Sequence, residues 1–168
     1  MGLGKSRHGR GESGVALVEM AIVIPLLLLL VFAMLDLGVV LYRDISLTQG
    51  VREAARQGAV ALYDGGNPAC SGGTPTDNLV CLAKQRVGVS GVAIHVIAPT
   101  TNKVGSQFAV CATYKTSAIT GLTKPFLPDY IHTETIMRLE QAPTPGLTTG
   151  GADTDPEGNN WLSCKAPS

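Results

Sequence analysis

The sequence predicts an α+β fold: a long N-terminal helix, transmembrane and then amphipathic, followed by a small domain with a short helix and a three- or four-stranded antiparallel sheet. One observation behind this fold is the apolar run of residues 20–35, which provides most of a membrane helix. Another is the change of hydrophobic period, from three- and four-residue steps before residue 63 to alternation after residue 89. Turn residues between these two parts separate the long helix from the domain.

With 168 residues, the chain has room for one modest domain beside a membrane segment. Its 13 basic and 13 acidic residues cancel, which gives no reason to expect a nucleic-acid partner. Lys5, Arg7 and Arg10 precede the apolar run, whereas the charges that follow it are mixed. By the positive-inside bias, we expect a single-pass protein with a cytoplasmic N-terminus and with everything after Tyr42 exported.

The order of these patterns divides the chain into five segments. We expect a basic leader (1–14), a transmembrane helix (15–42), a periplasmic amphipathic extension of it (43–63), a small α+β domain with disulfides (64–141) and a tail rich in Pro, Thr and Gly (142–168). The tail lacks periodicity, which predicts poor order, although Trp161 indicates that its end is pinned to the domain.

Residues 1–42 have three competing interpretations. A secretory signal would have an apolar core of about 7–15 residues followed by a small-x-small cleavage site. The apolar stretch of residues 15–42 is too long for this, and no such site follows it. A plain anchor needs only about 20 residues, even with a helix kink at Pro25, but it leaves Glu19 unexplained because a carboxylate in a membrane segment is costly.

The third interpretation is a prepilin-type segment, which a membrane peptidase cuts on the cytoplasmic side between Gly14 and Val15. Gly14 suits such a cut, since a residue without a side chain lets the catalytic groups approach an extended backbone. The freed amine of Val15 would pair with Glu19, either one helical turn away or on a neighbouring subunit, and so offset the cost of burying both charges. Glu19 would then set the register of assembly.

Residues 14–25, Gly-Val-Ala-Leu-Val-Glu-Met-Ala-Ile-Val-Ile-Pro, precede five leucines and resemble the start of the TadE-like proteins. These are pseudopilins of the Flp/Tad (tight adherence) pilus system, and they typically carry a Glu followed six residues later by a Pro. Glu19 and Pro25 keep that spacing, whereas Met20 stands where the family usually has an aromatic residue. Residues 54–59 and 137–140 are also similar to the family, so the resemblance covers about residues 11–141.

The resemblance implies a minor pilin or pseudopilin that takes part in the assembly or initiation of a Tad/Flp type IV pilus, a system of adhesion and secretion. Its partners would be the prepilin peptidase, other pilin or pseudopilin subunits, the inner-membrane assembly platform and membrane lipid. It would lie in the bacterial inner membrane or in the pilus, with its domain periplasmic or extracellular. The alternative is a single-span anchor that carries a periplasmic binding or enzymatic domain unrelated to pili.

Beyond the membrane the helix continues, and paired glycines and a proline in residues 64–68 end it. Gly50 indicates a bend. Thr76 or Asp77 caps a second helix that runs to about Val87. The predicted apolar face of the long helix consists of Leu41, Ile45, Thr48, Val51, Ala55, Gly58 and Leu62.

Alternating apolar residues predict strands over residues 92–98 and 108–114, with Gly105 in the turn between them, and a third strand over residues 133–139. Four cysteines, an even number on the exported side, favour two disulfides, and three pairings are possible. The favoured pairs are Cys70 with Cys81, which lies off the apolar face of the short helix, and Cys111 with Cys164, which would return across the outer face of the sheet.

The side chains give no catalytic or metal site and no cofactor motif, so we do not expect an enzyme. His8, His95 and His132 have no spacing that places two on one face. Asp153, Asp155 and Glu157 are arranged like an oxygen-rich calcium loop but lack its glycine and distal glutamate, so we expect a solvated acidic tail. No phosphate-binding loop, nucleophile elbow or dinucleotide motif occurs in the sequence.

Overall fold

The computed structural model describes residues 10–121, 123–151 and 153–164, so most of the predicted leader and the end of the tail lie outside it. The described chain has the predicted α+β architecture, with a long helix, a short helix and a three-stranded antiparallel sheet in the order β1-β2-β3. The elements are α1 (Arg10–Ala59), η1 (Pro68–Cys70), α2 (Pro75–Val87), β1 (Val92–Ile97), β2 (Gln107–Lys115), η2 (Lys124–Phe126) and β3 (Tyr130–Arg138).

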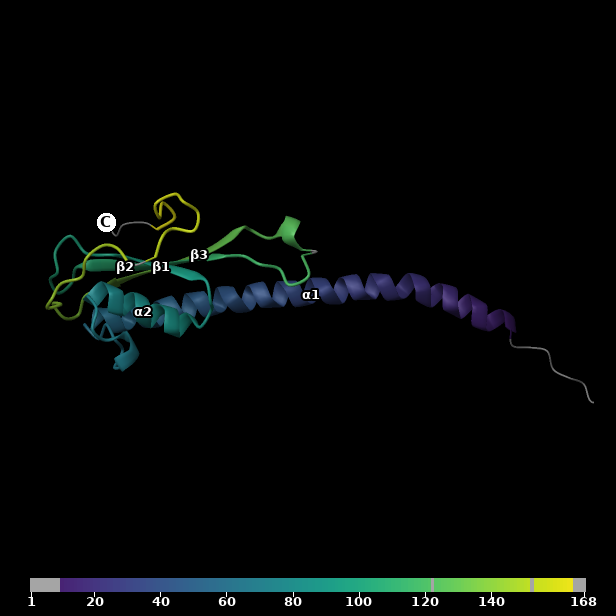
Figure 1. Cartoon of the computed structure of the whole chain (residues 1–168), viewed down its shortest axis with the longest axis horizontal. Coiled ribbons are helices and arrows are strands. Elements are labelled where there is room, and N and C mark those ends of the chain that lie inside the picture. The colour runs from purple at the N-terminus through teal and green to yellow at the C-terminus, as the bar shows by residue number, and fades with distance from the viewer. Residues whose placement is uncertain (1–9, 122, 152, 165–168) are drawn as a thin grey trace, which may run out of the picture.

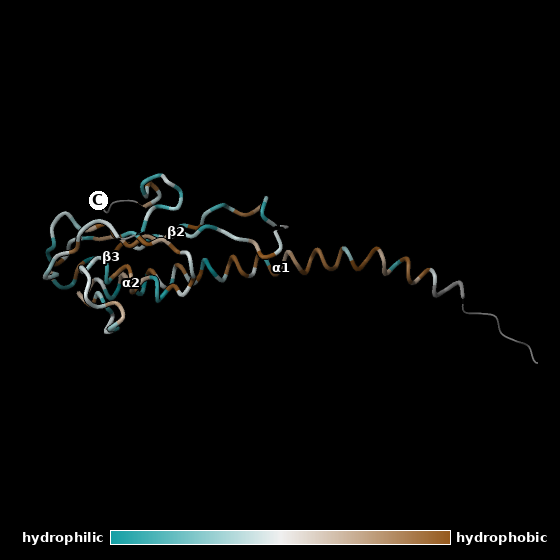
Figure 2. Tube along the Cα trace, in the orientation of Figure 1, coloured by the Kyte–Doolittle hydropathy of each residue, from teal (hydrophilic) through white to brown (hydrophobic). Residues whose placement is uncertain are grey.

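Helix α1 has 50 residues and is therefore about 75 Å long. Its C-terminal part packs beneath the domain, while the N-terminal part projects far beyond it (Figure 1). The projecting part is almost entirely apolar, and the helix becomes mixed only where the domain begins (Figure 2). The helix thus has an apolar part and an amphipathic part, as the pattern of its apolar residues predicted.

Helix α1 ends at Ala59, before the paired glycines that were predicted to stop it. The N–H of Leu62 donates to the carbonyl of Gln57 at 3.0 Å, and the N–H of Ala61 donates to that of Gly58 at 3.1 Å. These two bonds form a Schellman cap, whose left-handed residue is usually glycine. Here Ala61 takes that conformation, with φ of +61°. Because alanine is not typical of a helix end, the sequence does not indicate that the helix ends here.

The face of α1 that meets the domain differs from the predicted one. Leu41, Ile45 and Leu62 are each more than half exposed, so their place in the predicted apolar face is wrong. The sheet, α2 and the loop between β2 and β3 instead cover a stripe offset by one residue toward the N-terminal end of the helix. Its buried or half-buried members are Asp36, Val40, Arg43, Leu47, Gly50, Val51, Ala54 and Gly58.

Helix α2 is capped by Thr74, two residues before Thr76 and three before Asp77, which were the predicted caps. The hydroxyl of Thr74 accepts a hydrogen bond from the N–H of Asp77 at 3.2 Å, and Pro75 occupies the first helical position. Thr76 is buried instead, and its hydroxyl donates to the carbonyl of Thr148 at 2.8 Å. The side chain that looked like a cap therefore holds the C-terminal segment.

The sheet separates the helices from the C-terminal segment. The side chains of Phe108, Val110 and Ala112 on β2 join the core formed with α1 and α2. Strand β3 starts at Tyr130, three residues before the predicted start, and pairs with the whole of β2. Both helices lie on one side of the sheet in Figure 1, and the yellow C-terminal segment lies on the other.

The described tail residues are packed on the domain, so the predicted poor order is wrong for them. Gly150 exchanges two backbone hydrogen bonds of 2.9 Å with Val96 at the edge of β1, and Leu147 is buried. Asp153 accepts hydrogen bonds from Lys84 Nζ at 2.5 Å and from the N–H of Ile94 at 2.8 Å. Backbone hydrogen bonds and an ion pair hold this segment, and the periodicity of the sequence cannot predict such contacts.

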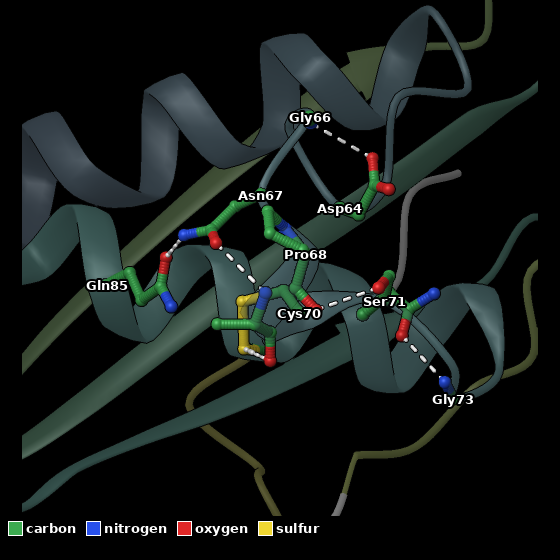
Figure 3. The surroundings of a disulfide bond; sticks show 11 residues. Asp64, Gly66, Asn67, Pro68, Cys70, Ser71, Gly73 and Gln85 are labelled. Atoms are coloured by element: carbon green, nitrogen blue, oxygen red, sulfur yellow. Dashed lines mark hydrogen bonds between the residues drawn. A yellow bond between two sulfur atoms is a disulfide. The ribbon is translucent and has the colours of Figure 1, made fainter.

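Two disulfides close the domain, in the pairing that the sequence favours. Cys70 is bonded to Cys81, and Cys111 to Cys164, with Cα–Cα distances of 5.5 and 5.9 Å. Figure 3 shows the first, which ties the loop after α1 to α2. Beside it, the amide of Asn67 donates to Gln85 on α2 and its oxygen caps η1. The bond and the amide together fix the loop that leaves the long helix.

Candidate functional site

The projecting part of α1 is the first candidate functional region. Every large apolar side chain in residues 15–35 is exposed, and none of them is covered by the domain. These residues span about 30 Å at 1.5 Å per residue, which equals the thickness of a bilayer's hydrocarbon core. Among the described residues, one helix is long and apolar enough to cross a membrane, and this region is its apolar part.

The predicted cleavage and register residues lie at the start of this region. Gly14 and Val15 are both within α1 and exposed, and nothing lies within 4 Å of a Cβ placed at Gly14. The backbone at Gly14 is thus helical rather than extended, so the predicted cut would require local unwinding. A glycine makes that unwinding easier by about 1 kcal/mol relative to alanine.

Glu19 lies four residues after Val15, so both side chains are on one face of the helix. Its carboxylate is exposed, and no ion pair among the described residues involves it. Pro25 follows within the same helix, where it removes one backbone donor. The structure therefore brings Val15 and Glu19 to one face of the helix, where the carboxylate is exposed.

The second candidate region is the junction between this helix and the domain, which is built around Asp36. Its side chain is fully buried although both neighbours on the helix are exposed leucines. Oδ1 accepts hydrogen bonds from the N–H groups of Ile119 and Thr120, each at 3.0 Å. Oδ2 accepts from the hydroxyls of Thr120 at 2.5 Å and of Thr123 at 2.9 Å. Four donors thus satisfy the buried charge.

These donors all come from the loop between β2 and β3, of which residues 116–121 and 123–129 are described, here named the β2–β3 loop. Two helical turns farther from the N-terminus, Arg43 Nη1 donates to the carbonyl of Ser117 at 3.1 Å and to its hydroxyl at 2.7 Å. The guanidinium also lies 5.2 Å from the ring centroid of Tyr114. The loop is therefore fastened to α1 at two levels about 10 Å apart.

A third set of polar residues lies on the outer face of the sheet, around a shallow pocket of about 200 Å³. Thr113 Oγ1 lies 3.2 Å from His132 Nδ1, and His132 Nε2 lies 2.8 Å from Glu157 Oε1. This hydroxyl, imidazole and carboxylate stand in the order of an acyl-transfer triad. However, Thr113 is only 2% exposed, so little of its side chain faces the pocket. The arrangement links β2, β3 and the C-terminal segment.

The acidic motif of the tail forms a closed turn. Burial alone would raise the pKa of Asp155, but the N–H groups of Trp161, Glu157 and Asn159 donate to its carboxylate and hold the pKa below its ordinary value. Trp161 stacks on His95, with ring centroids 4.9 Å apart, and burial lowers the pKa of that imidazole. Asp155 thus accepts hydrogen bonds from backbone N–H groups. The spacing of Asp153, Asp155 and Glu157, which is similar to that of a calcium loop, did not predict this role.

Asp36 is the functional residue that the sequence reasoning missed. In the sequence it is only one of the mixed charges that follow the apolar run. A signal was present, because stepping back from Leu47 by four and three residues gives Arg43, Val40 and Asp36 on one face. Its partners could not be found in this way, because the loop that supplies them is about 80 residues away in the chain and has no periodicity.

The fold and these two regions define a small disulfide-bonded α+β domain carried on a helix that could span a membrane. Residues 14–56 of that helix match the family model TadE, described as TadE-like protein, as the resemblance predicted for this segment. The match begins at Gly14 and indicates a protein associated with Tad pili. It ends before the sheet, so the similarity read in residues 137–140 lies outside it. No curated protein and no solved structure matches the chain.

Proposed function

We propose that this chain is a minor pilin or pseudopilin that takes part in the assembly or initiation of a Tad/Flp pilus after cleavage by a prepilin peptidase. The observation that carries the proposal is Glu19, an exposed carboxylate on an apolar helix, one turn from Val15 and within the TadE-like segment. The peptidase would release residues 1–14 in the cytoplasm. The new amine of Val15 would then neutralise Glu19 on its own or a neighbouring helix and set the register of packing.

The shape of the molecule supports this role. A filament built from such subunits needs a helix that is free of its own domain along the part that packs against other subunits. The exposed side chains of residues 15–35 meet that need, because they are available first to lipid and then to neighbouring helices. The domain would face the periplasm or the exterior. The protein would act by assembly rather than as a catalyst.

The test is the N-terminus of the membrane-bound protein, determined by mass spectrometry in cells with and without an active prepilin peptidase. We expect a start at Val15 only where the peptidase is active. An intact N-terminus in both strains would instead support a plain anchor that carries a binding or enzymatic domain. A cut after Leu41 would mean that the segment is a signal peptide.

The role of Glu19 is tested with Glu19→Ala, and Asp44→Ala is the matched control. Both residues are exposed acids on α1, but Asp44 lies beyond the apolar region. We expect Glu19→Ala to insert into the membrane at the normal level and to abolish pilus assembly. Asp44→Ala should assemble normally. Normal pili with Glu19→Ala would contradict the proposed pairing.

A further inference from the structure

The β2–β3 loop carries large apolar side chains that the domain does not cover. Phe126 is 87% exposed and Ile119 is 68% exposed, which are high values for side chains of this size. Lys124 stands two residues before Phe126, within η2, and is exposed as well. Basic and aromatic side chains together are typical of segments that lie at a membrane surface.

The position of the loop along α1 follows from its two attachments. Strand β2 ends at Lys115, after which the chain meets Arg43 and then descends to Asp36. Asp36 follows directly on the apolar residues 15–35, whose length already equals the hydrocarbon thickness. Figure 1 shows the green loop as the part of the domain that reaches farthest toward the N-terminal end of α1.

The opposite face of α1 indicates where the membrane surface lies. Leu37, Leu41 and Ile45 are each more than half exposed, so this face stays apolar for about two turns beyond Asp36. The first exposed charge past the apolar region is Asp44. A bilayer whose hydrocarbon core covers residues 15–35 has its headgroups beside residues 36–44, where Leu37 and Leu41 are exposed, and this is the level of the β2–β3 loop.

We propose that the β2–β3 loop is a second membrane contact, which inserts Ile119 and Phe126 at the boundary between headgroups and acyl chains. Lys124 meets the lipid phosphates, and Asp36 holds the loop at this depth. A helix with one span leaves a domain free to tilt and rotate about its axis. Contact on one side of the helix fixes the orientation of the domain relative to the membrane. This inference depends on the membrane anchoring of α1 but not on pilus assembly.

Tryptophan fluorescence in bilayers tests the proposal, because Trp161 is the only tryptophan in the chain. In a Trp161→Phe background, Phe126→Trp is introduced into the full chain, which is reconstituted in phosphatidylcholine vesicles. Acyl-chain bromines near the glycerol or near the bilayer centre act as quenchers. We expect a blue-shifted emission that loses intensity with the shallow bromines and loses much less with the deep ones, since interfacial groups lie about 5–10 Å deep.

Two control positions make the result decisive. Leu26→Trp, within the apolar region, should be quenched most by the deep bromines. Val104→Trp, exposed in the turn at the other end of β2, should emit as in water and stay unquenched. An unquenched Leu26→Trp would overturn the anchoring and this inference together.

Two outcomes overturn the inference alone, with Leu26→Trp quenched as expected. One is an unquenched, red-shifted Phe126→Trp, which places the loop in water. The other is a blue-shifted but unquenched Phe126→Trp whose shift disappears when the protein is diluted in lipid. That result would assign the loop to contact with a second copy of the chain.

Discussion

Asp36 and Glu19 are carboxylates on the same apolar helix, but their surroundings differ completely. Four donors from the β2–β3 loop surround Asp36, so its charge is satisfied within the chain. Glu19 is exposed and has no ion-pair partner among the described residues. A charge in an apolar setting needs a partner. Asp36 therefore binds the domain, whereas Glu19 remains available for pairing.

We expect Asp36→Ala to release the β2–β3 loop without unfolding the domain. The substitution leaves the amides of Ile119 and Thr120 without their acceptor, and each lost bond to a charged group is costly. Hydrogen exchange measured by mass spectrometry on the chain in nanodiscs should show these amides exchanging roughly tenfold faster. Amides of β2 should be unchanged. Asp44→Ala serves as the control and should alter neither region. Equal protection of the loop amides in both variants would contradict the proposed role of Asp36 in holding the loop.

At the scale of elements, the packing of α2 on α1 depends on a single missing side chain. A Cβ at Gly50 would lie 2.5 Å from the backbone nitrogen of Val87 and 2.6 Å from its Cα. Real Cβ atoms essentially never make non-bonded contacts this short, so α2 would have to shift. The bend that Gly50 was expected to mark is therefore better understood as a close approach of two helices.

We expect Gly50→Ala to destabilise the domain by about 1–3 kcal/mol, because overpacking against backbone outweighs the gain in helix propensity. Gly38→Ala is the matched control, since it lies in the same helix with nothing within 4 Å of the added Cβ. It should be neutral or slightly stabilising. Thermal unfolding in detergent, followed through Trp161, measures both, and equal melting temperatures for the two variants would refute the close-packing argument.

The elements themselves could be predicted because their periods are local properties of the sequence. The long helix, the short helix and three strands follow from steps of three to four and of two residues. Their ends were predicted less well, since Ala61 takes a conformation that alanine rarely adopts and Thr74 caps a helix that Thr76 was expected to cap. The loop that binds Asp36 could not be predicted, because its contacts depend on the tertiary fold.

At the scale of the whole molecule, the chain is fastened at one end of the sheet and on its outer face. At the end nearest the apolar part of α1, the β2–β3 loop is tied to α1. On the outer face, the segment of residues 153–164 is held by the Cys111–Cys164 disulfide and by the turn around Asp155. The tail was expected to be poorly ordered because it lacks periodicity, with its end pinned to the domain near Trp161. The order of residues 153–164 comes from one disulfide and from backbone N–H donors, and a polar segment can have both of these.

The disulfide and the Asp155 turn should substitute for each other at neutral pH. In Cys111→Ser/Cys164→Ser, the segment is held without a covalent link, and Trp161 should still stack on His95. The pKa of Asp155 is lower in the folded protein than in the unfolded chain, so its stabilisation is complete above about pH 4 and is lost as the pH falls through the folded value. The double variant should therefore release Trp161 in acid.

Emission from Trp161 against pH measures this release, with far-UV circular dichroism to show that the sheet and helices persist. We expect the double variant to shift to the red below about pH 4, while the unmodified chain shifts less because its disulfide keeps Trp161 near the sheet. Cys70→Ser/Cys81→Ser removes the other bond, which is on the helical side, and should behave like the unmodified chain. Coincident curves for all three proteins would mean that neither the disulfide nor Asp155 holds the segment, and its order would then have to come from its contacts with β1 and Lys84.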